Sequence, residues 1–184
     1  RYIPKPGKRP KSPANMRPIS LLPSISKLFE RILQTRLQST QAGIFHDWQF
    51  GFRQGRQQMH SVLQLAHLLY APPRHAPILP VSIDFSAGFD RVWHPALLHQ
   101  LYNAGLLILL CKLIKSYLTG RQIRVRTGTV LSKICSIETV VPQGSVLGPW
   151  LFSALTAGYD PPTLTVMYAD DFVLTDTELR LRER

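Results

Sequence analysis

The sequence predicts an α+β fold, in which helices are mixed with short strands that pair antiparallel. Apolar residues recur at helical spacing in several segments, whereas other segments are short apolar runs bounded by turn residues. The chain has 184 residues and is 45% hydrophobic, so it can bury a sizeable core in one domain or two small ones. This composition excludes a disordered tail.

Positive charge is concentrated at the start of the chain. The formal net charge is +11, from 22 Lys and Arg against 11 Asp and Glu. Residues 1–60 hold 11 basic and 2 acidic residues, while residues 61–184 hold 11 and 9. A role in solubility alone explains the total charge but not this asymmetry. The gradient favours a polyanionic partner facing the basic half.

The first half is predicted to hold a basic arm and two helices. Residues 1–18 are rich in proline and are expected to be an extended arm without secondary structure. A helix is expected to begin at Ser24, and a second to span about 57–70. Gly51 is expected to allow a tight bend between them. The apolar positions of the first helix are Leu28, Phe29, Ile32, Leu33 and Leu37. The inward positions of the second are Met59, Val62, Leu63, Ala66 and Leu69.

After a proline-rich connector over 71–80, a short buried strand is predicted over 81–84, with Pro80 denying it one ladder hydrogen bond. Two helices, 91–102 and 106–118, are separated by an Asn-Ala-Gly stop signal. The second has one apolar stripe that is expected to be core. Its members are Leu109, Leu110, Leu113, Ile114, Tyr117 and Leu118.

The last elements are predicted from alternation and turn residues. Residues 122–126 alternate apolar and basic side chains, which is typical of a half-buried strand, and residues 134–141 should pair with it antiparallel. A loop at 142–145 then opens into a helix over about 146–157. Pro161 and Pro162 follow and end this helix.

The two cysteines, Cys111 and Cys135, lie in apolar contexts without a CxxC pair, so both are expected to be reduced core residues of an intracellular protein. The expected location is the nucleus or the cytoplasm. No run of eighteen apolar residues occurs, which predicts no membrane partner, and the basic start excludes a secretory signal. Both ends break off amid charged residues, so a fragment of a longer chain is expected.

An acidic segment, Tyr168-Ala169-Asp170-Asp171, lies between two apolar runs and is predicted to form the tip of a β-hairpin. Asp pairs are common in turns for structural reasons alone. Asp84, however, ends another apolar run, so two strand ends would bring three carboxylates together. Such a like-charge cluster is hard to keep ionised without bound cations. Two Mg²⁺ ions held in this way are the usual clamp for nucleotidyl transfer.

Five blocks in order make the chain resemble the reverse transcriptase domain of non-LTR (LINE-like, jockey-type) retrotransposons. The resemblance covers nearly the whole chain, and each block alone is weak. The blocks are residues 17–23 (RPISLLP), 49–53 (QFGFR), 84–94 (from Asp84 to His94), 142–147 (PQGSVL) and 168–171 (YADD).

This resemblance implies a right-hand polymerase whose antiparallel palm sheet packs on helices. Residues 1–77 would be the fingers with a basic amino-terminal arm, and residues 78–184 a truncated palm from which the thumb is absent. The implied activity is RNA-directed DNA polymerisation, with an RNA template, a DNA primer and dNTPs as partners. Two Mg²⁺ ions, or Mn²⁺ as the alternative, would be the cofactors. The oligomeric state is not implied.

The resemblance also assigns the three carboxylates. Asp84, Asp170 and Asp171 would bind the metal ions, with Asp171 the weakest candidate for direct ligation. One ion would activate the primer 3′ hydroxyl, and the other would hold the triphosphate and stabilise the leaving pyrophosphate. Catalysis would then consist of positioning and charge neutralisation.

Further residues are assigned to the nucleotide and the template. Phe85 and Phe89 would lie beside the incoming nucleotide, with the Phe89 ring disfavouring a 2′ hydroxyl. The alternative, which is less favoured, is that Phe89 is a core aromatic at a strand-to-helix junction. Gln143 and Gly144 match the loop along the nascent base pair. The basic candidates are Arg17 and Lys27 for the nucleotide and Arg53 for the template, and each could equally be a solvated charge.

Departures from the family pattern leave a second function open. Gly88 stands where Ala is common, Gly148 replaces a usual Ser, and Val140 lies near a usual Gly. A decayed or domesticated remnant would bind nucleic acid without polymerising. A relative of group II intron or RNA-dependent RNA polymerases fits less well, because residues 89–94 are retrotransposon-like. Without a thumb, this segment alone is expected to polymerise poorly or not at all.

Overall fold

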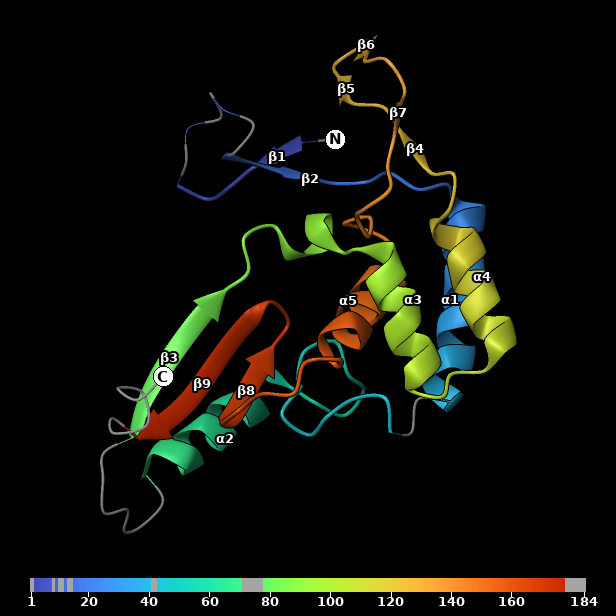
Figure 1. The fold of residues 1–184 in the computed structure, drawn as a ribbon. Helices are drawn as coiled ribbons and strands as arrows, with labels where there is room; N and C mark the ends of the chain where they lie inside the picture. The colour runs from blue at the N-terminus through green and yellow to red at the C-terminus, as the bar shows by residue number, and fades with distance from the viewer. Residues whose placement is uncertain are drawn as a thin grey trace.

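Three antiparallel strands form the main sheet of the computed structural model, which describes residues 2–7, 9, 12, 15–40, 43–70 and 78–177. The strands are β3 (Ile78–Asp84), β8 (Leu164–Tyr168) and β9 (Asp171–Thr177), in the order β3-β9-β8 (Figure 1). β8 and β9 are joined by a two-residue turn, Ala169 and Asp170, because Tyr168 pairs with Asp171. The predicted hairpin and the α+β fold class are confirmed.

The edge strand β3 differs from its prediction. It is longer than the expected 81–84 and it is not buried, since Leu79, Val81 and Ile83 are each about two-fifths exposed. Its position at the edge explains the exposure, because β9 is its one strand partner among the described residues. Pairing with β9 over all seven residues accounts for its length. An edge strand also tolerates Pro80, which has no N–H to give to a ladder. The rest of the predicted connector, residues 71–77, lies outside the described residues.

The main core lies where four helices meet. These helices are α1 (Ser24–Thr40), α3 (His94–Asn103), α4 (Ile108–Leu118) and α5 (Gly148–Thr156), and a short 3-10 helix, η2 (Gly88–Arg91), precedes α3 (Figure 1). Each long helix places at least one side chain in the core that is 0% exposed: Leu37, Leu97, Ile114 and Leu151. The core thus combines residues from 1–77 and 78–184, and the division into fingers and palm stays a prediction.

Helix α1 begins at Ser24 as predicted, but its apolar residues do not all face inward. Leu33 and Leu37 are buried, whereas Leu28, Phe29 and Ile32 are 55%, 44% and 58% exposed. Apolar residues occupy more than one side of this helix, so periodicity alone could not say which side would meet the core.

Helix α2 (Gln58–Tyr70) covers one face of the main sheet, against β8 and β3. Leu68 packs there with Val166, whereas the predicted inward residues Met59, Val62 and Leu63 are exposed. In α4, likewise, Ile114 and Leu118 are buried, but Leu109 and Leu113 are exposed. These inward assignments were wrong because a neighbouring element, rather than the helix itself, selects the buried side.

Short strand pairs replace two predicted segments. The amino-terminal arm is extended but not free of structure, because β1 (Tyr2–Pro4) pairs antiparallel with β2 (Met16–Pro18). The predicted pair of 122–126 and 134–141 is reduced to β4 (Gln122–Ile123) with β7 (Cys135–Ser136). Between them, β5 (Arg126–Thr127) pairs with β6 (Val130–Leu131).

The cysteines have different environments. Cys111 is buried in the core, and burial raises the pKa of its thiol. Cys135 lies on β7 and is exposed, so the prediction that both are core residues was wrong for Cys135. None of the helices in the described part of the chain combines the length and the apolarity that crossing a membrane requires.

A buried carboxyl group, Glu30, joins α1 to the start of α5. Its side chain is 0% exposed, and Oε2 accepts hydrogen bonds from the backbone N–H of Val146 at 2.6 Å and of Leu147 at 3.2 Å. Oε1 accepts a hydrogen bond from the Tyr117 hydroxyl at 3.2 Å. Glu30 thus satisfies the N–H groups of the two residues that immediately precede α5, which begins at Gly148. Burial raises the pKa of Tyr117, and Glu30 raises it further.

We expect Glu30→Ala to lower the free energy of unfolding by about 3 kcal/mol, because it leaves the N–H groups of Val146 and Leu147 without a hydrogen-bond partner. Glu30→Gln keeps an accepting oxygen and should cost less. Urea unfolding followed by circular dichroism measures both. The exposed Glu138 provides the control, and Glu138→Ala should change stability by no more than about 0.5 kcal/mol. Equal stabilities of Glu30→Ala and Glu138→Ala would contradict this role.

Candidate active site

The main sheet brings the three predicted carboxylates to one of its ends. Asp84 is the last residue of β3 and lies directly opposite Asp171, the first residue of β9. Directly opposed residues of antiparallel strands place their side chains on the same face. Asp170 precedes Asp171 in the turn and is half-buried, whereas Asp84 and Asp171 are exposed. Two strands and one turn therefore supply a shared location for the three side chains.

The chemistry of this set suits a divalent cation, because carboxylate oxygens are the ligands that Mg²⁺ and Mn²⁺ prefer. The backbone register supports the fit, since it places Asp84 and Asp171 as direct neighbours. The side chains, however, are not gathered: among the described residues, no three His, Cys, Asp or Glu lie in an arrangement that could hold a metal ion. Binding would therefore require the carboxylates to turn toward a common point.

The turn between β8 and β9 has a strained backbone. Ala169 has a φ of 57°, in the left-handed region that residues with a Cβ avoid. Such a conformation costs on the order of 1 kcal/mol and persists only where the surroundings enforce it. The position of Asp170, the next residue, therefore depends on what packs against the turn.

Residues 48–53, which we call the bracing loop, pack against this turn. The Met167 N–H donates to the Trp48 carbonyl, and the Phe50 N–H donates to the Met167 carbonyl, both at 2.8 Å. These bonds attach the loop to β8 through a parallel bridge between Gln49 and Met167. The loop thereby runs on toward the acidic turn.

Gly51 of the bracing loop touches the turn itself. A Cβ at this position would collide with the backbone nitrogen of Ala169 and would lie 2.8 Å from its Cα. The expected bend is present, because Gly51 and Phe52 lie in a turn, but Gly51 does not have the positive φ that would require a glycine there. Close approach of two backbones requires it.

Two polar side chains hold the bracing loop in place. Gln49 is 1% exposed, and its Nε2 donates to the Ser153 carbonyl of α5 at 2.9 Å. The guanidinium of Arg53 donates to the carbonyls of His46 and Gln49, at 2.6 and 3.1 Å. Burial lowers the pKa of Arg53, and the nearby Arg56 lowers it further. Arg53 thus has a structural role, and its contact with a template stays a prediction.

The ring of Phe89, at η2, is fixed by two other aromatics. It stacks on Phe152 with 4.9 Å between ring centroids and meets the edge of Phe52 at 6.0 Å. A Cβ at Gly88 would lie 3.0 Å from the Phe152 ring, which explains why glycine stands where alanine is usual. Phe89 is therefore a packed ring beside the core, and its part in sugar selection stays a prediction. Phe85 is 41% exposed.

Residues 142–145 pack between η2 and the segment that follows β2. Gln143 donates from Nε2 to Asp90 Oδ1 at 3.2 Å, and its carbonyl accepts the Ser20 N–H at 2.8 Å. Gly144 has a φ of 101°, and a Cβ there would lie 3.0 Å from the Ser20 carbonyl oxygen. The Val141 N–H donates to the Phe89 carbonyl at 2.9 Å. The structure thus brings Gln143 and Gly144 close to Phe89.

Gly148 also departs from the family pattern for a packing reason. A Cβ at this position would lie 2.6 Å from Ser145 Oγ, which accepts the Gly148 N–H at 2.8 Å. A serine at 148 would displace this hydroxyl from the start of α5.

The basic candidates Arg17 and Lys27 are exposed on β2 and on the first turn of α1, and their phosphate contacts stay predictions. A cavity of about 480 Å³, which also includes Pro18 next to Arg17, is lined by Gln143, Asp90 and three arginines. These are Arg121, Arg124 and Arg126. The sequence pattern of 122–126 predicted Arg124 and Arg126 only as the polar side of a strand and did not single out Arg121, although the spacing of the three was the available signal for a basic site.

Comparisons with known proteins place the chain in a family. A family model described as reverse transcriptase (RNA-dependent DNA polymerase) matches residues 3–181. The probable RNA-directed DNA polymerase from transposon BS of Drosophila melanogaster is 41% identical over 94% of this chain and 20% of the relative. The RNA-directed DNA polymerase from mobile element jockey of Drosophila funebris is 37% identical, over 92% and 20%. This chain thus spans about a fifth of the length of these relatives.

A solved structure shows the same fold. Telomerase from Candida tropicalis, in complex with a fragment of telomeric RNA, matches 87% of this chain and 30% of its own, with a TM-score of 0.59. Its sequence identity is 12%, so this likeness concerns the fold alone. The sequence relatives and the family match identify the chain as a member of the reverse transcriptase (RNA-dependent DNA polymerase) family, related to those of jockey, X-element and BS retrotransposons.

Proposed function

We propose that this chain supplies the catalytic carboxylates of an RNA-directed DNA polymerase, which extends a primer 3′ hydroxyl on an RNA template during retrotransposition. One observation carries the proposal: Asp84 and Asp171 are opposed in register at the sheet end where the turn presents Asp170. In a chain of this family, this backbone arrangement favours two-metal nucleotidyl transfer, for which the three carboxylates would turn toward a common point.

In this proposal, Asp84, Asp170 and Asp171 hold two Mg²⁺ ions, for which Mn²⁺ is the alternative. When bound, the ions supply charge neutralisation around the reacting phosphate. The contribution of the protein is positional. Asp84 is fixed by the β3–β9 ladder, and Asp170 by a turn that the bracing loop holds in its strained form.

The remaining predicted site residues would place the substrates. Phe89, fixed between Phe152 and Phe52, would form a rigid wall at the nucleotide sugar, and Phe85 would lie near it. Gln143 and Gly144 would follow the nascent base pair. Arg17 and Lys27 would contact the triphosphate of a dNTP, and Arg53 the RNA template. The protein would act inside the cell, in the nucleus or the cytoplasm.

A second candidate is a remnant that binds nucleic acid without polymerising. One observation favours it, namely that the described carboxylates do not already form a cluster that could hold a metal ion. The basic first half of the chain would suffice for such binding.

Replacing Asp170 separates the two candidates. In a protein extended to the length of its relatives, Asp170→Asn should lower primer extension on RNA by at least about 100-fold, since it removes a cation ligand worth several kcal/mol. Extension is measured with dNTPs and Mg²⁺, and Glu138→Gln serves as the control. Equal background extension by Asp170→Asn and the unaltered protein would support the remnant.

Phe89→Ala should reduce the preference for dNTPs over rNTPs by about 10- to 100-fold, because it removes the wall at the 2′ position. The ratio of kcat/KM for the two nucleotides is the measurement, since the folded fraction of enzyme cancels in it. An unchanged ratio would assign Phe89 to packing alone.

Gly51→Ala should lower kcat by about tenfold or more, with little change in the KM for dNTPs, because the new Cβ displaces the turn that holds Asp170. Gly158→Ala is the matched control, since a Cβ there meets only the flexible end of the Gln100 side chain. Adding Ala169→Gly should restore part of the kcat, because a glycine turn can adjust its backbone. A kcat equal to that of the Gly158 control would exclude this role for Gly51.

A further inference from the structure

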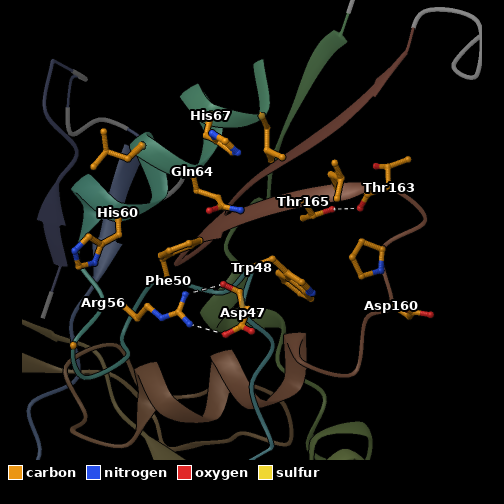
Figure 2. A pocket seen from close by; sticks show the side chains of 15 residues that line it. Asp47, Trp48, Phe50, Arg56, His60, Gln64, His67, Asp160, Thr163 and Thr165 are labelled. Atoms are coloured by element: carbon orange, nitrogen blue, oxygen red, sulfur yellow. Dashed lines mark hydrogen bonds and ion pairs between the residues drawn. The ribbon is translucent and has the colours of Figure 1, made fainter. Parts of the chain in front are cut away.

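A cavity of about 840 Å³ lies between α2, residues 47–56 and the start of β8 (Figure 2). Its volume is within the range of small-ligand sites. Thr163, Leu164 and Thr165 line one side, and α2 lines another. Asp84, Asp170 and Asp171 do not line this cavity, although Trp48 and Phe50 of the bracing loop do.

Planar groups form one part of its wall. Arg56 donates to the Asp47 carbonyl at 2.9 Å and to Asp47 Oδ1 at 2.7 Å, and its guanidinium lies 5.0 Å from the centroid of the Phe50 ring. Figure 2 shows this pair beside Trp48. Trp48 in turn stacks on His46, with 5.2 Å between centroids and 9° between planes. A planar group entering the cavity would therefore meet flat side chains, with which stacking is favourable.

Polar side chains of α2 form another part. His60, Gln64 and His67 are four and then three residues apart, so they share one side of the helix, and all three are exposed (Figure 2). The Gln57 N–H donates to His60 Nδ1 at 3.1 Å, which leaves His60 Nε2 as a donor. Across the cavity, the buried Thr163 Oγ1 has no hydrogen-bond partner within the described residues. The wall thus offers both donors and acceptors.

The charges of the lining side chains indicate whether the phosphate or the base of a nucleotide fits this cavity. Its single arginine, Arg56, is paired with Asp47, and Asp160 adds a further negative group. A phosphate would therefore gain little here. A nucleobase, which is flat, uncharged and edged with donors and acceptors, matches the planar surfaces and the polar row.

We propose that this cavity binds an unpaired nucleobase of a single-stranded segment of the nucleic-acid substrate. The proposal rests on the proposed function, because it takes the substrate class from it. The position of the cavity supports this proposal. Leu164, the first residue of β8, lines the cavity, and Tyr168, the last residue of β8, lies beside the acidic turn. The two residues are four positions apart along the strand, a distance of about 13 Å. Trp48 and Phe50 also belong to the bracing loop, so one segment contacts both the cavity and the turn.

Binding of labelled oligonucleotides, measured by fluorescence anisotropy without dNTPs or metal ions, tests the proposal. The triple variant His60→Ala, Gln64→Ala, His67→Ala should bind an eight-nucleotide single strand about tenfold more weakly, through the loss of several hydrogen bonds. Arg56→Lys keeps the charge but loses the flat guanidinium, and should also weaken binding. His99→Ala, an exposed histidine of α3 outside the cavity, is the control and should have no effect.

Two features distinguish base binding from phosphate binding. The slope of log Kd against log salt should be the same for the triple variant and the unaltered protein, because no phosphate contact is removed. An abasic strand of the same length should bind both proteins equally. A larger loss with RNA than with DNA would assign the base to the template, and the reverse would assign it to the primer.

Equal affinities of the triple variant and the His99 control for single strands would overturn the proposal, as would a loss that persists with the abasic strand. Because these measurements involve no catalysis, their failure would leave the Asp170 result untouched. Conversely, a protein that binds through this cavity but extends no primer would overturn the polymerase and not the cavity.

Discussion

The contact between Gly51 and Ala169 is the constraint on which the site depends. The acidic turn keeps a left-handed alanine, a conformation that would relax if the turn were free. Two backbone hydrogen bonds from Met167 attach the bracing loop, and Gly51 then leaves no room for the turn to move toward it. Because Asp171 is paired with Asp84 across the ladder, fixing the turn also fixes Asp170 relative to both. The location of three carboxylates thus follows from one close backbone approach.

Buried polar side chains connect this arrangement to the helical core. Gln49 ties the bracing loop to α5, and Glu30 ties α1 to the first N–H groups before the same helix. Because α5 is held from two directions, the residues that precede it, Gln143 and Gly144, are held as well. Removing either side chain would leave buried donors or acceptors unpaired, which costs more than the hydrogen bond itself contributes. The site is therefore supported by the first half of the chain although its carboxylates come from the second.

Local sequence signals predicted what depends on local physics. The start of α1 at Ser24, the hairpin tip at 168–171 and the strand ending at Asp84 each follow from caps, turn residues or apolar runs. The sequence placed both aspartates in the turn, whereas Asp171 begins β9. The register that opposes Asp84 to Asp171 joins segments far apart in the sequence, so no local pattern contained it. The exposed faces at Leu28 and Met59 have the same cause, since only a packing partner selects the buried side. Gly51 shows most clearly what the sequence cannot tell, because a glycine required for a bend and one required for close backbone approach are the same residue in the sequence.

The distribution of charge suggests that different parts of the chain attract a nucleic acid and recognise its bases. Residues 1–60 carry most of the excess positive charge, which attracts any polyanion and weakens with salt. The cavity beside α2 has its one arginine neutralised, so it contributes little to that attraction and can respond instead to the shape and the edge of a base. The proposed function requires strong contacts that do not depend on sequence, and stacking on flat groups provides them because every base has a π-face. The basic half would then hold the strand, and the cavity would orient it with respect to the carboxylates.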